Sequence, residues 1–190
     1  MNNVNFFEEE MYHMFDASGI SNDIAYIKNS ISYPDFLINF IDETEWNKHN
    51  NITFKKINGS YPVSSLNNKK SYIVNSLYMA AEMSFDAYRS AKQIRKDAFQ
   101  VDLENTTAYL VQDNESLNNL IKNVNNDILC LTILNNNISV EFEGRVTQIV
   151  EGSTIISPKE AIYTAIATAG PIYVIITPII NKSKLTDCLM

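Results

Sequence analysis

The sequence contains few of the residues that catalytic and metal sites use most. Its 190 residues include two cysteines, two histidines and five glycines. Two cysteines exclude zinc sites built from paired Cys-x-x-Cys motifs, and isolated glycines exclude the glycine-rich loops that bind nucleotide phosphates. No Gly-x-Ser-x-Gly motif, which would expose a nucleophilic serine, is present. The sequence therefore shows no motif of an enzyme active site.

The two cysteines lie in unlike surroundings. Cys130 is inside the apolar run DILCLTIL, which predicts a buried, reduced thiol. Cys188 is third from the end rather than fourth, so the C-terminal tail is not a prenylation motif. No disulfide framework is expected, which favours a reducing compartment. The N-terminus has neither a basic start nor an apolar stretch, so we expect no signal peptide and a cytoplasmic protein.

Each of the two histidines follows a glutamate at a helical spacing. His13 comes three residues after Glu10, and His49 comes four residues after Glu45. Carboxylate–histidine pairs bind iron in di-iron helix bundles, but such a site needs two matching pairs and two further glutamates. Because the spacings here do not match, we interpret both pairs as solvated surface pairs. We expect no catalytic residue, no cofactor-binding residue, no cofactor and no metal ligand.

Positive charge is scarce as well. Fifteen lysines and arginines stand against 22 aspartates and glutamates, for a formal net charge of −7. A nucleic-acid-binding protein needs a positive surface, so this class is not expected. The basic cluster within residues 89–96 follows acids on one predicted helix, and we interpret it as charge compensation. Runs of asparagine, such as Asn118-Asn119, are typical of AT-rich codons and are assigned no chemistry.

Apolar residues, by contrast, are plentiful. They make up 45% of the chain, enough for a sizeable core. Residues 161–180 contain no charged side chain and have the length of a membrane span. Gly170-Pro171 interrupts this run and mostly β-branched residues follow, which favours strands over a helix. We therefore predict no membrane span but a core hairpin of two strands, 161–168 and 172–180, the second of them central in its sheet.

The first half of the chain is predicted to be mainly helical. The apolar periodicity indicates amphipathic helices at 4–15, near 21–27, from Pro34 onward and at 71–99. The last of these contains neither glycine nor proline and is the most extensive. Residues 47–70 are rich in turn dipeptides and are predicted to form a loop with one short strand.

From residue 105 onward, the pattern changes to short apolar runs separated by turn residues. One short helix is predicted at 114–124. Closely spaced strands joined by tight turns indicate an antiparallel meander. The antiparallel strands leading to an apolar terminus resemble the cupin-like sensor domains of bacterial regulators. No metal-binding histidine accompanies them and no motif matches, so no family is assigned.

The predicted fold class is therefore α+β. Amphipathic helices, one of them long at about 71–99, would pack on an antiparallel meander sheet formed mainly by residues 105–182. We expect one domain over residues 1–190, with a helical half at about 1–104 and a β-rich half at about 105–190. The pattern leaves open whether the sheet is open or closed into a barrel.

Three classes of function fit these observations. The first is a non-enzymatic protein–protein interaction or assembly subunit of a viral, phage or secretion-type particle, with a protein partner or self-association, because both ends of the chain are apolar. The second is a small acidic inhibitory or immunity-type protein that covers a basic partner. The third is a small-molecule-binding sensor domain, or an enzyme, with a pocket between helix and sheet. We expect the first, without enzymatic activity.

Overall fold

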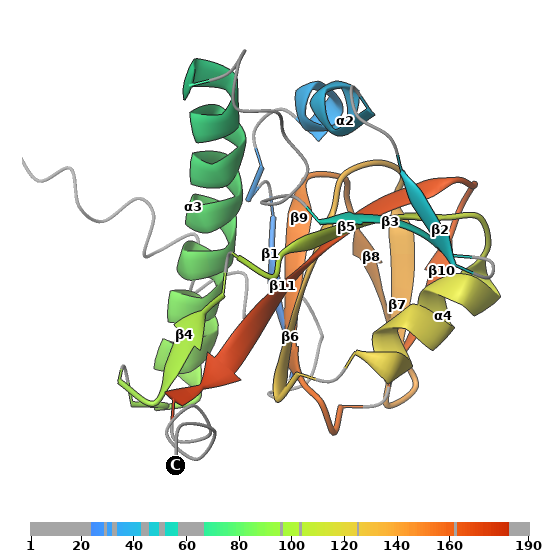
Figure 1. Ribbon diagram of the computed structural model, residues 1–190. Helices are drawn as coiled ribbons and strands as arrows, with labels where there is room; N and C mark the ends of the chain where they lie inside the picture. Colours follow the sequence, from blue (N-terminus) through green and yellow to red (C-terminus); the bar gives the residue numbers. More distant parts are fainter. Residues whose placement is uncertain are drawn as a thin grey trace, which may run out of the picture.

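The computed structural model describes residues 24–28, 30–31, 34–42, 46–49, 52–56, 67–95, 97–102, 104–124, 126–161 and 163–182. Two antiparallel sheets face each other, and the helices lie around them (Figure 1). This arrangement of two facing sheets is a jelly roll. Among the described residues, no helix is long and apolar enough to cross a membrane.

Within the described ranges, the larger sheet has eight strands and the smaller has three. The larger sheet has the order β1 (Ala25–Ile27), β9 (Ser153–Pro158), β6 (Ile128–Ile133), β11 (Ile172–Asn181), β5 (Thr107–Val111), β3 (Ile52–Lys56) and β2 (Asn47–His49). Strand β4 (Phe99–Val101) pairs with the far end of β11. The smaller sheet has the order β10 (Thr164–Ala167), β7 (Ile138–Phe142) and β8 (Arg145–Ile149). The helices are α2 (Pro34–Asp42), α3 (Asn67–Ala91) and α4 (Asn114–Asn123).

The α+β prediction with a meander sheet is wrong. From β6 onward, strands that follow one another in the sequence mostly belong to different sheets: β6 and β7, β8 and β9, β9 and β10, and β10 and β11 are separated in this way. A short connection can join two strands of one sheet or cross to the facing sheet, and its turn residues are similar in both cases. The periodicity therefore located the strands but could not assign them to sheets.

The hairpin β7–β8 shows a turn that the sequence does specify. Phe142 pairs with Arg145, so Glu143 and Gly144 form a two-residue connection. Both residues have left-handed backbone conformations, with φ of 49° and 74°. Two-residue hairpins require such angles because only these turns match the twist of the flanking strands. Glycine adopts this conformation without strain, which explains Gly144 at this position.

Strand β11 lies in the middle of the larger sheet, as predicted for the second half of the uncharged run. It pairs with β5 on one side and with β6 on the other. Val174 and Ile176 point between the sheets, whereas Ile175 packs on the opposite face with residues of α2 and α3. Both faces of β11 are covered, which is why the strand is apolar throughout.

The predicted hairpin of the uncharged run is wrong. Strand β10 pairs with β7 in the smaller sheet and not with β11. Its residues alternate between exposed and buried, with Thr164 and Ile166 exposed and Ala165 buried, so one face of β10 meets solvent. Gly170 lies where the chain crosses between the sheets, and a Cβ there would stand 2.7 Å from the Gln112 carbonyl oxygen.

Helix α3 covers the outer face of the larger sheet (Figure 1). Leu77 packs in the same apolar cluster as Ile175, and Phe85 in the same cluster as Ile179. The predicted range of 71–99 extends too far, because Gln93 adopts a left-handed conformation just after Ala91, where the helix ends. Residues 99–101 form strand β4 instead.

The N-terminal part of the chain contains more strand than predicted. Residues 25–27, expected in a short helix, form β1, which pairs with β9 and is fully buried. The predicted loop at 47–70 contains the hairpin β2–β3 and the beginning of α3. The predicted helix at 4–15 lies outside the described residues. Three residues are too few to show the hydrophobic periodicity of a strand, so the sequence could not predict β1. Its strand conformation depends on burial and on pairing with β9.

Candidate ligand pocket

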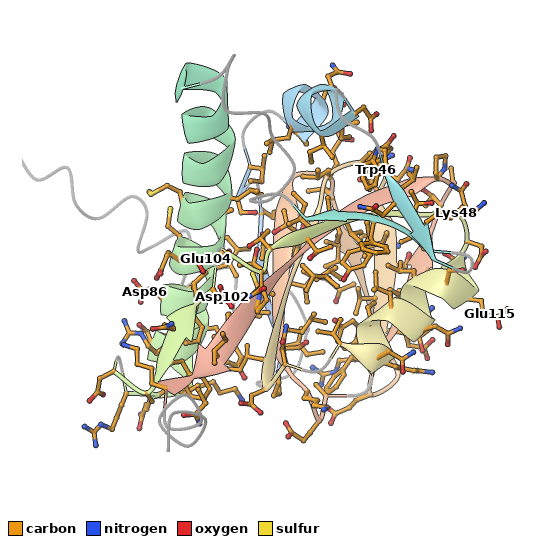
Figure 2. All side chains as sticks on the ribbon, in the orientation of Figure 1. Trp46, Lys48, Asp86, Asp102, Glu104 and Glu115 are labelled. Carbon is orange, nitrogen blue, oxygen red and sulfur yellow. The ribbon has the colours of Figure 1, made fainter. Side chains whose placement is uncertain are left out.

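The space between the two sheets is filled by side chains. Aliphatic and aromatic residues from both sheets form one continuous cluster: Ile24, Tyr26, Val111, Leu117, Leu120, Leu129, Leu131, Ile133, Ile138, Val140, Phe142, Ile149, Ile155, Tyr163, Ala165, Ile172, Val174 and Ile176. The cluster contains no histidine, cysteine, carboxylate or basic side chain. Figure 2 shows the labelled charged residues, such as Lys48, Asp86 and Glu115, at the periphery. The interior of the barrel is therefore a packed apolar core.

A few buried hydroxyl groups are the only polar side-chain groups that this part of the core displays among the described residues. The Tyr26 hydroxyl accepts a hydrogen bond from the Val150 amide at 3.2 Å. Burial raises the pKa of Tyr163 to about 12, an effect that nearby Ser157 slightly opposes. The hydroxyls of Ser157 and Tyr163 lie near each other, and neither has a hydrogen-bond partner among the described residues. Neither is a metal ligand of the usual kind.

Helix α4 takes the place of a strand at the edge of the smaller sheet. In the sequence it lies between β5 and β6, and in space it lies beside β10 (Figure 1). Asn118 accepts from the Ala165 amide at 2.9 Å and donates to the Ala165 carbonyl at 2.8 Å. Asn114 accepts from the Ala167 amide at 2.7 Å. Side-chain amides thus satisfy backbone groups of β10 that a neighbouring strand would otherwise pair.

The local sequence fixes where α4 begins and how it is oriented. Asp113 caps its N-terminus by accepting from the Ser116 amide at 2.7 Å, and this hydrogen bond lowers the pKa of Asp113. Leu117 and Leu120 are buried in the core cluster. Because residues three or four apart share a helix face, Asn119 and Asn123 lie together on a face different from that of Asn118.

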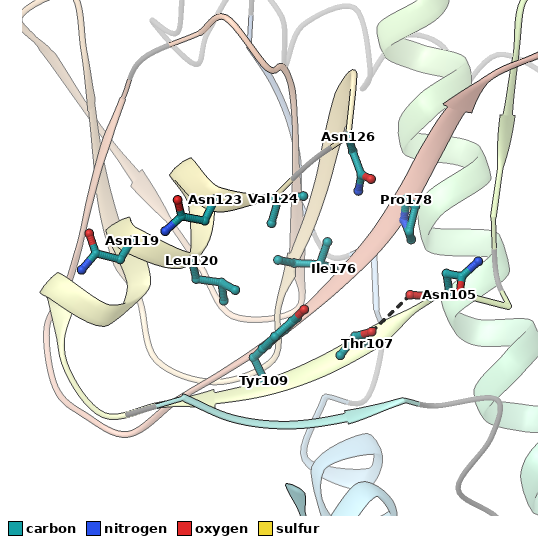
Figure 3. Close-up of a pocket in the computed structure, with 10 residues that line it drawn as sticks. All are labelled: Asn105, Thr107, Tyr109, Asn119, Leu120, Asn123, Val124, Asn126, Ile176 and Pro178. Carbon is teal, nitrogen blue, oxygen red and sulfur yellow. Dashed lines mark hydrogen bonds between the residues drawn. The ribbon is translucent and has the colours of Figure 1, made fainter. Parts of the chain in front are cut away.

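A pocket opens between α4 and the inner faces of β5 and β11 (Figure 3). Its volume is about 310 Å³. Ten residues line it: Asn105, Thr107, Tyr109, Asn119, Leu120, Asn123, Val124, Asn126, Ile176 and Pro178. The hydroxyl of Tyr109 points toward Ile176, and the side chain of Asn126 enters from the loop after α4 (Figure 3).

The described residues of the lining are a mixture of polar and apolar ones, and none of them carries a charge. The Thr107 hydroxyl donates to the Asn105 carbonyl at 3.2 Å, and the Asn105 amide donates to Asp102 at 2.6 Å. Burial raises the pKa of Tyr109, an effect that Thr107 partly opposes, so its hydroxyl keeps its proton at neutral pH. Within the described part of the chain, the amides of Asn119, Asn123 and Asn126 make no hydrogen bond, so they are available to a ligand.

Of the residues that the sequence suggested as candidate ligands, the structure describes only His49. His49 is the last residue of β2, at the outer edge of the larger sheet, and Glu45 lies outside the described residues. Glu10 and His13 lie outside them as well. Cys130 is fully buried, as predicted. Burial raises its pKa to about 12, which makes it unreactive.

Within the basic cluster, ion pairs agree with the predicted charge compensation. Arg89 pairs with Asp86 at 2.8 Å, and Arg95 pairs with Asp97 at 3.0 Å. Sequence reasoning missed the pocket, because its asparagines were attributed to codon usage. The useful signal was the spacing of four residues within α4, between Asn114 and Asn118 and again between Asn119 and Asn123.

Comparison with known proteins identifies the fold as that of 2-oxoglutarate- and Fe(II)-dependent oxygenases. A prolyl hydroxylase from Trichoplax adhaerens, solved with a hypoxia-inducible-factor peptide, superposes with a TM-score of 0.58 at 10% identity, covering 100% of this chain and 97% of that one. An oxidoreductase of the 2OG-Fe(II) oxygenase family from Burkholderia pseudomallei has a TM-score of 0.52 at 8% identity, covering 94% and 92%. No protein-family model and no curated protein sequence matches.

A third structure with this fold is the non-heme α-ketoglutarate-dependent epimerase SnoN from nogalamycin biosynthesis. It has a TM-score of 0.51 at 7% identity, and the superposition covers 91% of this chain and 82% of that one. The main hypothesis of a non-enzymatic assembly subunit is therefore contradicted, because the proteins that share the fold over most of the chain are enzymes. At such low identity the likeness establishes the fold alone, and the residues of this chain must be considered for themselves.

The described residues do not fit the iron centre that this fold suggests. Non-heme Fe(II) oxygenases hold iron with two histidines and one carboxylate. This chain has two histidines in total, so such a site would need both His13 and His49. No described group of three His, Cys, Asp or Glu side chains could hold a metal ion. Among the described residues, the side chains between the sheets are apolar apart from a few hydroxyl groups, such as those of Tyr26, Ser157 and Tyr163.

Proposed function

We propose that this protein binds a small molecule in the pocket between α4, β5 and β11, without using a metal ion held inside the barrel. The observation that carries the proposal is the contrast between the packed apolar core between the sheets and a pocket whose asparagine amides have no hydrogen-bond partner among the described residues. Ligand pockets combine an apolar surface with a few well-placed polar groups. Leu120, Val124, Ile176 and Pro178 supply the apolar surface here, and the asparagines supply the polar groups.

The size and position of the pocket support this proposal. Pockets for small molecules have volumes of roughly 300–1,000 Å³, and this one has about 310 Å³. It would suit a ligand at the small end of that range. The third class of function considered for the sequence includes a pocket between helix and sheet, without naming its residues, and the location of this pocket supports that class.

The helix that forms one wall of the pocket is held firmly in place. The hydrogen bonds of Asn114 and Asn118 to β10 fix α4 to the smaller sheet, and Leu117 anchors it in the core. A wall that is already fixed loses little conformational freedom when a ligand binds, so less of the binding energy is lost to ordering.

Protein NMR with a chemically mixed fragment library tests the proposal. Fragments that bind are expected to shift the amide signals of Thr107, Tyr109, Leu120 and Val124 together. The exposed Asn123 offers a way to block the pocket, since Asn123→Trp would place an indole in its mouth. Asn137→Trp is a matched control, because Asn137 is exposed and lies in the turn before β7.

The two variants give opposite expected results. Asn123→Trp should abolish the clustered shifts, and Asn137→Trp should leave them unchanged. Shifts that cluster elsewhere on the protein, or that persist unchanged in Asn123→Trp, would contradict the proposal.

A further inference from the structure

We infer that the ligand of this pocket is an uncharged, polyhydroxylated molecule of the carbohydrate class, recognised by the amides of Asn119 and Asn123 and the hydroxyl of Tyr109. This inference rests on the proposed function and specifies the chemistry of the same site.

The hydrogen-bonding groups match those of a polyol. Each asparagine amide offers two donors and an acceptor, and each sugar hydroxyl likewise both donates and accepts. One amide can therefore bind two neighbouring hydroxyls at once. Asn119 and Asn123 stand one helical turn apart on the same face of α4, and Asn126 follows in the next loop. None of these amides has a hydrogen-bond partner within the described part of the protein.

The absence of charged side chains among the described lining residues disfavours ionic ligands. No lysine or arginine is among the ten lining residues. A carboxylate or phosphate would lose water on entering without gaining a cation, and this loss is costly. Asp102, which is hydrogen-bonded to Asn105, would add repulsion. A dicarboxylate such as 2-oxoglutarate is disfavoured for the same reason, and so are nucleotides.

The orientation of Tyr109 disfavours flat aromatic ligands. Its ring packs beside that of Phe54, with centroids 6.4 Å apart and an angle of 37° between the planes. Its hydroxyl, rather than the open face of the ring, points into the pocket (Figure 3). Tyr109 is the one aromatic residue among the described residues of the lining. A nucleobase would therefore find no face on which to stack.

The apolar side of the pocket completes the match. Leu120, Val124 and Ile176 line it opposite the polar groups. A sugar ring presents C–H groups on its faces and hydroxyls around its rim, so it can contact apolar and amide groups at the same time. A simple hydrocarbon would leave the amides without partners.

Saturation-transfer NMR with a defined panel of sugars tests the inference. The uncharged probes are glucose, galactose, mannose, N-acetylglucosamine and myo-inositol. Their charged counterparts are glucuronic acid, glucose 6-phosphate and glucosamine. We expect saturation transfer to at least one uncharged probe and weaker or no transfer to its charged counterpart.

Three variants locate the binding. Asn119→Ala and Asn123→Ala should each weaken the affinity for the bound sugar by about 2- to 10-fold, the usual effect of losing one hydrogen bond. Asn137→Ala should leave it unchanged. A sugar that binds equally well to all three variants, or a preference for the charged probes, would overturn the inference.

The fragment experiment separates failure of this inference from failure of the proposed function. If fragments occupy the pocket and no sugar binds, the carbohydrate assignment is wrong and the pocket function stands. If neither fragments nor sugars bind there, both are wrong.

Discussion

The side-chain amide of Asn118 forms hydrogen bonds with both backbone groups of Ala165, accepting from its N–H at 2.9 Å and donating to its C=O at 2.8 Å. A neighbouring strand would make similar contacts with an edge strand such as β10. A helix can therefore occupy the position of a strand without leaving these backbone groups unsatisfied. The same helix forms one wall of the pocket.

We predict that Asn118→Ala destabilises the protein by about 1–3 kcal/mol, because it leaves partly buried backbone groups of Ala165 without partners. Urea denaturation followed by circular dichroism measures the loss. Asn119→Ala is the matched control on the adjacent position and should change the free energy of unfolding by less than about 0.5 kcal/mol. Equal effects of the two substitutions would contradict this role for Asn118.

We predict that Ile175→Asp prevents folding. Ile175 is fully buried in the central strand, so the carboxylate of the introduced aspartate would be buried without a partner. The expected loss is roughly 4 kcal/mol or more. Ile166→Asp, on the solvent-facing side of β10, should fold normally, because Ile166 is 45% exposed. Soluble expression and thermal unfolding compare the two. A stable Ile175→Asp protein would show that this strand is not part of the core.

We predict that stability falls at alkaline pH in a way that depends on Tyr163. Its pKa is raised from 10.0 to about 12 by burial, so the unfolded chain releases this proton first. The contribution of the protonated Tyr163 hydroxyl to stability is fully present below about pH 10 and is lost as the pH rises towards about 12. The free energy of unfolding should fall by roughly 2–3 kcal/mol in total over this range. Thermal unfolding from pH 7 to 11 measures the loss, and Tyr163→Phe should reduce it.

Cys130 provides a separate control for the alkaline experiment. Burial raises its pKa from 9.0 to about 12, so its contribution begins to fall near pH 9 rather than pH 10. Cys130→Ala should remove this earlier part of the decline and leave the later part. An alkaline profile that neither substitution changes would mean that other groups cause it.

We predict that removal of divalent metals has no effect on stability. The described residues contain no group that could hold a metal ion, so treatment with EDTA should leave the unfolding temperature unchanged. Equimolar Co(II) should produce no visible absorption of a bound ion, and His49→Ala should behave like the unaltered protein. Stoichiometric Co(II) binding that depends on both His13 and His49 would contradict this expectation.

The order of most elements in the second half could be predicted from the sequence. Strand β7 alternates buried and exposed residues, which predicts that one face is buried. The segment of β11 is apolar on both faces, which predicts that both faces are buried. The amphipathic pattern of α4 likewise marked a helix with Leu117 and Leu120 inward. The hydrophobic periodicity of a segment is a local property, because it depends only on residues that are close together in the chain.

The candidate site could not be predicted in the same way. Tyr109, Asn123 and Ile176 come from separate elements and meet only because β5 and β11 pair and α4 lies across them. The sequence of each segment does not indicate that these three residues lie close together. The asparagines of α4 also serve two purposes on two faces, with Asn118 binding β10 and Asn123 facing the pocket, and composition cannot separate these roles.

The sequence by itself determined a large apolar core, the absence of known catalytic motifs and the positions of most strands, because hydrophobic period and turn residues act over short distances. The tertiary structure alone decided that these strands divide between two sheets, that α4 replaces one of them and that a pocket forms beside it. Pairing between distant strands depends on which apolar faces can be buried together, and that choice involves the whole chain at once.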